Sequence, residues 1–246
     1  MKAIILCAGY ATRLYPLTQN QPKALLSVGD KPILDHIIEK LEKVEQVDEI
    51  YIITNDKFLS NFFHWHESYK PKKTVTILTD GTKNNEDRMG AVGDIEYVLR
   101  KKKIDDDIML IAGDNLFEFS MDKFISHFRA KKAAVTALYD IRNRSKAAKK
   151  YGVVILDNMG KMIDFEEKPA EPKSSMVSTG CYIFPKRVLP LVQEYIKETG
   201  KRDNPGNFIR WLSQRESVYG FVFTEHWFDI GSFEALEEAS NVYAKK

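Results

Sequence analysis

Short apolar runs alternate along the chain with segments whose apolar residues recur every three or four positions. Runs of β-branched and aliphatic residues are typical of strands buried on both faces, and four occur in the first half of the chain: 3–8, 50–54, 75–78 and 108–112. Helical periodicity fills the segments between them: 33–44, 58–69 and 90–100. Asp30 is a plausible cap for the first helix, with Pro32 in its first turn. This alternation predicts βαβ units and a parallel sheet.

The rhythm changes in the second half of the chain, which has more strands and fewer helices. Five further strands are expected there: 133–139, 153–156, 162–166, 181–184 and 218–223. A last helix is expected over residues 232–244. The expected fold is a single α/β domain over 1–246, Rossmann-like and three-layered, in which a mostly parallel mixed sheet carries an added β portion at one edge.

Composition narrows the class of protein but not its chemistry. The chain has 246 residues and 28.3 kDa, and 37 Lys and Arg against 35 Asp and Glu give a net charge of +2. This balance gives no electrostatic reason to expect nucleic acid or a membrane as partner. No apolar run reaches the ~20 residues that span a bilayer. Cys7 and Cys181 stand far apart, so a reducing, cytoplasmic location is expected.

The first predicted strand runs into a loop of small residues at 8–12, followed by Arg13. Small residues let the backbone approach a ligand and direct its N–H groups at phosphate oxygens. GxGxxG and GxxxxGK[ST] are both absent, which counts against a dinucleotide dehydrogenase or a P-loop ATPase. Arg13 and Lys23 beside such a loop suit a polyanion such as a triphosphate. A plain turn with two surface cations explains the segment equally well.

Two aspartates are candidates for holding a metal ion. Asp114 follows the fourth predicted strand and should face the loop at 8–13, because ligands lie beyond the carboxyl ends of parallel strands. Asp229 stands in an aromatic and aliphatic run, where an unpaired charge is costly. Mg²⁺ takes one or two protein carboxylates together with phosphate oxygens, so both acids suit that ion. Asp229 could instead cap a turn before Gly231.

Eight short blocks, taken in order, resemble the sugar-1-phosphate nucleotidyltransferases, and among them glucose-1-phosphate thymidylyltransferase-like enzymes. The blocks cover essentially the whole chain: Ala8-Gly9-x-x-Thr12-Arg13-Leu14-x-Pro16-Leu17-Thr18, Pro22-Lys23-Ala24-Leu25-Leu26, Val28-x-Asp30-Lys31-Pro32-Ile33-Leu34, Gly113-Asp114-Asn115, Tyr151-Gly152-Val153-Val154, Glu166-Glu167-Lys168-Pro169, Thr179-Gly180-x-Tyr182 and Trp227-Phe228-Asp229-Ile230-Gly231.

The resemblance implies a transferase that joins an NTP to a sugar 1-phosphate and releases pyrophosphate. It implies a nucleotide-binding half at about 1–130, a sugar-phosphate-binding half at about 131–231 and a C-terminal helix at 232–246. The catalytic residues would be Arg13, Lys23 and Lys168, and Mg²⁺ would be held by Asp114 and Asp229. The nucleotide would contact Ala8, Gly9, Tyr10, Ala11, Thr12, Arg13, Lys23, Asn85, Gly90 and Asp114. The sugar phosphate would contact Gly152, Glu167, Lys168 and Gly180.

The sequence departs from the family pattern at two places, which concern the conformation of the phosphate loop and the recognition of the base. Ala11 stands where the loop usually has glycine, which is tolerated unless that residue needs a positive φ. The segment expected to read the base, around Asn85 and Gly90, has the unusual acids Glu86, Asp87 and Asp94, which indicate no preference among dTTP, UTP, CTP and GTP. The sugar is not determined either. Two alternatives remain. The acceptor could be a small phosphorylated alcohol such as phosphocholine, or the protein could be a non-catalytic nucleotide-sugar sensor. A homo-oligomer is possible.

Other features favour simpler interpretations. His64 and His66 lie two apart on a predicted helix and point in different directions, which disfavours a shared metal. Phe62, Phe63 and Trp65 are expected in the core or at an oligomer contact. The basic segment 142–150 is expected to be a loop, which could also draw anionic substrates toward a neighbouring site.

Overall fold

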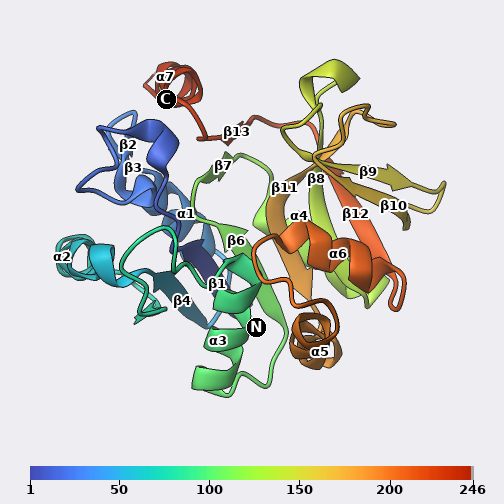
Figure 1. Ribbon diagram of the computed structural model, residues 1–246, viewed down its shortest axis with the longest axis horizontal. Coiled ribbons are helices and arrows are strands. Elements are labelled where there is room, and N and C mark those ends of the chain that lie inside the picture. Colours follow the sequence, from blue (N-terminus) through green and yellow to red (C-terminus); the bar gives the residue numbers. More distant parts are fainter. Residues whose placement is uncertain (245–246) are drawn as a thin grey trace.

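The computed structural model describes residues 1–244 and is built on a nine-stranded mixed sheet (Figure 1). Four strands form its parallel part: β1 (Lys2–Cys7), β4 (Glu49–Thr54), β5 (Thr74–Thr79) and β6 (Ile108–Ala112). β1 lies between β4 and β6, and β5 lies beyond β4, all pairs being parallel. The predicted parallel α/β sheet is therefore confirmed.

The other five strands extend the same sheet beyond β6. They are β8 (Ala134–Asp140), β9 (Gly152–Leu156), β10 (Met162–Glu167), β11 (Met176–Phe184) and β12 (Val218–Phe223). β11 runs antiparallel to β6 and joins the two parts, with β9 and β10 on one side and β8 and β12 on the other. The added β portion thus continues the sheet, as the change of rhythm predicts.

Within residues 1–244, helices lie against both faces of this sheet (Figure 1). One buried cluster contains side chains of α1 (Ile33–Glu42), α2 (Leu59–Tyr69), α4 (Met121–Lys131) and α7 (Phe233–Tyr243). A second contains side chains of α3 (Ala91–Lys102), α5 (Leu189–Thr199) and α6 (Pro205–Ser213). Along β1, Ala3 and Ile5 belong to the first cluster and Ile4 to the second, because successive side chains point to opposite faces. The result is the expected three-layer arrangement.

Several elements differ from the sequence prediction. The helices α4, α5 and α6 were not expected, although Asn204 and Pro205 are a cap and first-turn signal for α6. Asp30 does not cap α1, because residues 31–32 stay extended as β3 (Lys31–Pro32), paired with β2 (Ser27–Val28). The predicted last helix is confirmed as α7, capped by Ser232, and positions 245–246 of the C-terminal segment lie outside the described residues.

Among residues 1–244, every helix is too short or too polar to cross a lipid bilayer.

Candidate functional site

The loop after β1 is held in place by buried hydrogen bonds. The Asn55 side chain, directly after β4, donates to the carbonyl of Ala8 at 3.0 Å and accepts from the N–H of Phe58 at 3.0 Å. Ala11 adopts the left-handed conformation, with φ 47°, and its carbonyl accepts from the Thr18 hydroxyl at 2.7 Å. The loop therefore has the shape that usually calls for glycine, and alanine adopts it here with some backbone strain.

A close approach between β1 and β6 fixes where Asp114 lies. The N–H of Gly113 donates to the carbonyl of Leu6 at 2.9 Å. A Cβ at position 113 would lie 2.4 Å from Sγ of Cys7 and 2.9 Å from that carbonyl oxygen, so only glycine fits. The chain leaves β6 in contact with the end of β1, which brings Asp114 to the loop at 8–13.

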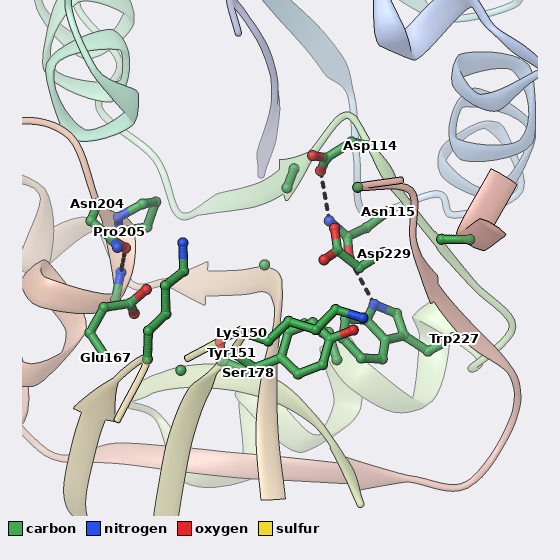
Figure 2. A pocket seen from close by; sticks show the side chains of 18 of the residues that line it. Asp114, Asn115, Lys150, Tyr151, Glu167, Ser178, Asn204, Pro205, Trp227 and Asp229 are labelled. Atoms are coloured by element: carbon green, nitrogen blue, oxygen red, sulfur yellow. Dashed lines mark hydrogen bonds between the residues drawn. The ribbon is translucent and has the colours of Figure 1, made fainter. Parts of the chain in front are cut away.

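Both oxygens of the Asp114 carboxylate are hydrogen-bonded. Lys23 Nζ donates to Oδ2 at 2.5 Å, and the Asn115 amide donates to Oδ1 at 2.7 Å. The Trp227 indole N–H donates to Asn115 Oδ1 at 2.8 Å (Figure 2). Trp227 thus holds Asn115 in place, and Asn115 orients the Asp114 carboxylate. Burial by itself would raise the pKa of Asp114, but the Lys23 ammonium and these hydrogen bonds bring it below its ordinary value. Asp114 is therefore ionised at neutral pH.

A short ribbon of β7 (Asn115–Phe117) and β13 (Trp227–Asp229) brings the second aspartate to the first. Asp229 is paired with Asn115, and the N–H of Ile230 donates to the carbonyl of Asp114 at 3.0 Å. Burial and then the negative charge of Asp114 raise the pKa of Asp229, although Lys23, Lys150 and Arg13 oppose this. Asp229 thus lies in a strand beside Asp114 and not at a turn cap.

The aspartate pair has the chemistry of a magnesium site completed by phosphate. In the part of the chain that the structure describes, no three His, Cys, Asp or Glu side chains gather as metal ligands. Mg²⁺ needs only one or two carboxylates when phosphate oxygens supply further ligands. The repulsion that raises the pKa of Asp229 is the kind that a divalent cation relieves, so the residues present fit such an ion.

Two cavities of about 610 and 380 Å³ open at the carboxyl edge of β1 and β6 and meet beside Asp114. Their common lining residues are Arg13, Ala112, Asp114, Lys168, Asn204 and Pro205. The larger cavity is also lined by the remaining residues of the predicted nucleotide group: Ala8, Gly9, Tyr10, Ala11, Thr12, Lys23, Asn85 and Gly90. The smaller is lined by Gly152, Glu167, Gly180 and Asp229, all predicted from the sequence.

The smaller cavity is lined by three lysines and by the carboxylates of Asp114, Glu167 and Asp229. Figure 2 shows these carboxylates together with Lys150. Glu167 lies against the start of α6, where a Cβ at Gly206 would come within 2.1 Å of its Oε2. Lys149, Lys150 and Lys168 line the same space, and the Lys150 ammonium lies 4.8 Å from the centre of the Tyr151 ring. Such a pocket suits a ligand that has both an anionic group and hydroxyls.

The structure therefore gathers all predicted site residues around the two cavities, and it adds residues that sequence reasoning missed. The additions are Asn115, Lys149, Lys150, Asn204 and Trp227 as an orienting donor. Asn115 and Trp227 belong to the family-like blocks at 113–115 and 227–231, and Lys150 directly precedes the block at 151–154, so the sequence held a signal for these three residues. Asn204 carried only a helix-cap signal.

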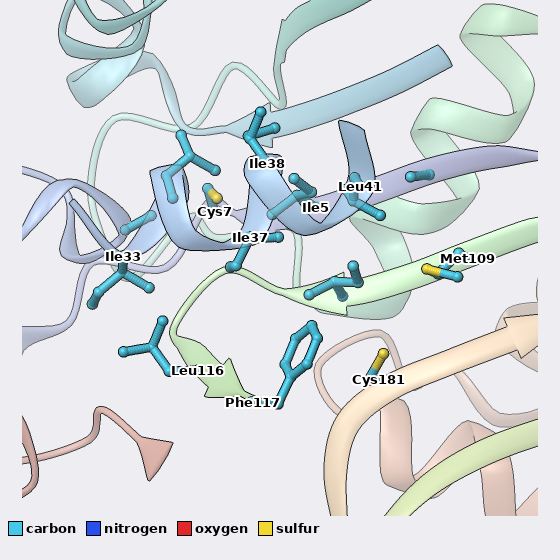
Figure 3. Packing of buried hydrophobic residues seen from close by; sticks show 14 of the residues in the cluster. Ile5, Cys7, Ile33, Ile37, Ile38, Leu41, Met109, Leu116, Phe117 and Cys181 are labelled. Carbon is cyan, nitrogen blue, oxygen red and sulfur yellow. The ribbon is translucent and has the colours of Figure 1, made fainter. Parts of the chain in front are cut away.

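The features given simpler interpretations lie mainly away from the two cavities, with two exceptions: Cys7 lines the larger cavity, and residues 149–150 line the smaller one. Cys7 and Cys181 are buried in the core, where burial raises the pKa of both thiols (Figure 3). Phe62 and Trp65 are buried as expected, whereas the Phe63 residue is 49 % exposed. The loop that contains residues 142–150 reaches the smaller cavity through its last two lysines.

Comparisons with known proteins agree with this arrangement. Over its whole length the chain is 36 % identical to the bifunctional protein GlmU of Methanocaldococcus jannaschii, and it spans only 55 % of that relative. It is 30 % identical to the UTP–glucose-1-phosphate uridylyltransferase AglF of Haloferax volcanii, with 75 % of this chain and 72 % of the relative covered. The chain thus spans about half the length of the GlmU relatives that it matches.

Solved structures give the same result. A Bacillus anthracis protein designated a glucose-1-phosphate thymidylyltransferase, in complex with a sucrose, superposes with a TM-score of 0.85 at 26 % identity. The match covers 100 % of this chain and 96 % of that one. A UDP-glucose pyrophosphorylase complexed with UDP-glucose shares the fold, with a TM-score of 0.82 at 21 % identity and coverage of 99 % and 98 %. The profile of the nucleotidyl transferase family matches residues 2–246, and the chain therefore belongs to that family.

Proposed function

We propose that the protein transfers a nucleotidyl group from an NTP to a sugar 1-phosphate, giving a nucleotide-sugar and pyrophosphate. The observation that carries this proposal is the pair of cavities that meet at Asp114 between Arg13 and Lys168. Two anionic substrates, one in each cavity, would bring their phosphates together at that junction. Positioning and charge neutralisation supply most of the catalysis in phosphoryl transfer of this kind.

The reaction is a single displacement at the α-phosphorus of the NTP. A phosphate oxygen of the sugar 1-phosphate forms the new P–O bond, the α–β phosphoanhydride bond breaks, and pyrophosphate takes the electron pair. The attacking phosphate is already anionic at neutral pH, so no general base is needed. This agrees with a junction lined by cations and carboxylates and lacking histidine.

Each cation at the junction has a place in this displacement. Arg13 follows the loop after β1 and would hold the departing pyrophosphate. Lys23 would contact the triphosphate near its α-phosphate, where its present partner is Asp114. Lys168 lines both cavities and would hold the sugar phosphate, while Glu167 would accept hydrogen bonds from sugar hydroxyls.

A divalent metal is typical of the family, and Mg²⁺ is the ion that this site suits. Asp114 and Asp229 would hold it, and when bound it neutralises charge on the phosphate oxygens. Asn115 and Trp227 would act on the ion only indirectly: Asn115 donates to the Asp114 carboxylate and Trp227 donates to Asn115, so the two hydrogen bonds fix the orientation of that carboxylate.

The test is pyrophosphate release measured with Mg²⁺ across a matrix of five NTPs and a panel of sugar 1-phosphates, with phosphocholine as a further acceptor. Release with an NTP and a sugar 1-phosphate supports the proposal. Pyrophosphate release with phosphocholine and with no sugar 1-phosphate would show that the acceptor is a small phosphorylated alcohol. Tight binding of nucleotide-sugars, with no pyrophosphate released from any pair of substrates, would overturn the proposed transfer activity and favour a nucleotide-sugar sensor.

A further inference from the structure

Two glycines from distant parts of the chain flank the Glu167 carboxylate in the smaller cavity. Gly152 begins β9 and pairs with Glu167 in the β9–β10 ladder, and Gly206 lies in the first turn of α6. A Cβ at Gly152 would lie 2.5 Å from Cζ of the Phe165 ring and 3.2 Å from Glu167 Oε2. A Cβ at Gly206 would lie 2.1 Å from the same oxygen and 2.8 Å from the same ring carbon. The two glycines thus leave the space that the carboxylate and the ring fill.

The backbone at Gly206 does not itself require glycine. The residue is helical, and it is not among the glycines with a positive φ in the part of the chain that the structure describes. Glycine is the poorest helix former apart from proline, so its presence in this turn weakens α6. What glycine supplies at this position is the absence of a side chain.

The first turn of α6 is fixed on its other side by α3. The carbonyl of Arg202, just before α6, accepts from the N–H groups of Val92 at 2.8 Å and of Gly93 at 3.3 Å. The Asn204 side chain accepts from the N–H of Gly206 at 2.9 Å. These hydrogen bonds hold the start of α6 against the start of α3. A clash at position 206 must therefore be relieved on the side of the smaller cavity.

On that side, the Glu167 carboxylate is the group that would move first. Phe165 is only 1 % exposed, and a closely packed ring yields with difficulty. Glu167 is half-buried, and Oε2 is the end of a side chain that turns about single bonds. Figure 2 shows its carboxylate beside Asn204 and Pro205, in the smaller cavity that all three residues line. A side chain at position 206 would thus displace a group that faces the cavity.

Given the function proposed above, we propose that Gly206 is a positioning residue for the sugar 1-phosphate, because the missing side chain sets where Glu167 presents its oxygens to the sugar hydroxyls. Hydrogen bonds weaken steeply when their distance and direction change, so a displaced carboxylate would bind the sugar poorly. Gly206 and Glu167 line the smaller cavity and are not among the residues that line the larger one. The effect should therefore be confined to the sugar substrate.

The experiment compares Gly206→Ala with the wild-type protein, using the NTP and the sugar 1-phosphate that release pyrophosphate fastest in the panel described above. We expect the KM for the sugar 1-phosphate to rise about tenfold or more, while kcat and the KM for the NTP change by less than about twofold. Calorimetric titration with nucleotide-sugars, UDP-glucose and GDP-mannose among them, is independent of turnover. The one that binds the wild-type protein most tightly should bind Gly206→Ala about tenfold more weakly.

Gly220→Ala is the matched control for a general packing defect. A Cβ at Gly220, in β12, would lie 2.6 Å from Cδ1 of the buried Leu138, and Gly220 is not among the lining residues of either cavity. This variant should lower the melting temperature and keep both KM values. A purely structural role for Gly206 would give Gly206→Ala the same behaviour. Thermal melting establishes that each variant is folded.

Glu167→Asp is the second variant, because it keeps the charge and withdraws the carboxylate from position 206. It should raise the KM for the sugar 1-phosphate by itself, since the position of the carboxylate is the quantity that matters. Adding Gly206→Ala to Glu167→Asp should cost little more, because the shorter side chain relieves the clash.

The outcomes separate this inference from the function on which it rests. An unchanged KM for the sugar 1-phosphate in folded Gly206→Ala, an equal rise in both KM values, or additive losses in the double variant would each overturn the inference and leave the transfer reaction standing. A wild-type KM for the sugar in Glu167→Asp would also overturn it, whether or not Gly206→Ala folds. Selective loss of nucleotide-sugar affinity in Gly206→Ala, with no pyrophosphate released from any substrate pair, would overturn the transfer reaction and support the positioning role.

Discussion

At the scale of single residues, the site depends on how each charge is paired. Asp114 stays ionised because Lys23 and Asn115 occupy its two oxygens, whereas Asp229, a short ribbon away, has a raised pKa. Burial and then the neighbouring carboxylate of Asp80 raise the pKa of Asp94 to about 8. The pKa of an aspartate is thus lowered at one position of this region and raised at two others, as burial and the neighbouring charges dictate.

Asp114→Asn tests the proposed metal-holding role. An amide keeps the shape of the side chain but loses the charge that would hold a cation and pair with Lys23. We expect turnover to fall at least about a hundredfold, while nucleotide affinity changes far less. Steady-state kinetics and calorimetric titration measure the two effects. Asp122→Asn, at an exposed position of α4, is the matched control, and near wild-type activity of Asp114→Asn would contradict the assignment.

The protonated state of Asp94 has a consequence for stability. Its ordinary pKa of 3.8 rises to about 8 in the folded chain, so the fold favours the neutral acid. The corresponding stability is fully present below pH 4 and is lost as the pH rises through about 8. The wild-type protein should therefore lose stability relative to Asp94→Asn between pH 5 and 9 (a range of about four units).

Thermal melting of both proteins at several pH values in that range measures this difference. Glu86→Gln serves as the control, and its melting temperature should follow that of the wild-type protein at each pH. Parallel curves for wild-type protein and Asp94→Asn would show that the carboxyl titrates alike in the folded and unfolded chain. Because the carboxyls of Asp80 and Asp94 interact, this pH dependence of stability reports the titration of both groups together.

At the scale of elements, the site is made where β1, β6 and the β7–β13 ribbon meet. The loop after β1 is tied to β4 through Asn55, and Asp114 leaves β6 through the close contact at Gly113. The ribbon then sets Asp229 beside Asp114. Strand ends are rigid supports, so the position of the charged groups follows from the pairing of the strands.

Gly113→Ala tests this close contact. The added Cβ would lie 2.4 Å from Cys7 Sγ and 2.9 Å from a backbone oxygen, so β1 and β6 would have to separate. We expect a loss of about 1–3 kcal/mol in the free energy of unfolding, measured by urea denaturation. Gly9→Ala, where no atom lies within 4 Å of the added Cβ, should be nearly neutral for stability. Equal stability of the two variants would contradict the steric argument.

At the scale of the whole molecule, one sheet runs through both predicted halves. β11 pairs with β6 and β9 along one edge and with β8 along the other, and side chains from both halves enter both buried clusters. The net charge of +2 says little about the site, where Arg13, Lys23 and Lys168 line the same two cavities as Asp114 and Asp229. The functional charges largely cancel inside the site.

Continuity of the sheet predicts that the two halves unfold together. We expect a single denaturant transition in which tryptophan fluorescence and far-ultraviolet circular dichroism coincide, as for one cooperative unit. Trp65 lies in the first half and Trp211 and Trp227 in the second, so fluorescence reports on both. Two separated transitions would instead show that the boundary near residue 130 divides independently folding parts.

The sequence by itself determined the strands of the parallel sheet, the location of α1, α2, α3 and α7, and the group of residues at the site. Buried strands and amphipathic helices leave a local period of apolar residues, and short blocks such as Gly113-Asp114-Asn115 keep chemical groups at fixed spacing. Only tertiary structure decided that the β7–β13 ribbon sets Asp229 beside Asp114 and that Lys149 and Lys150 line the smaller cavity. The period of apolar residues indicates which side of a helix or strand is buried. The contacts named above join parts of the chain that are distant in sequence and depend on strand pairing and loop packing. They therefore produce no local sequence pattern.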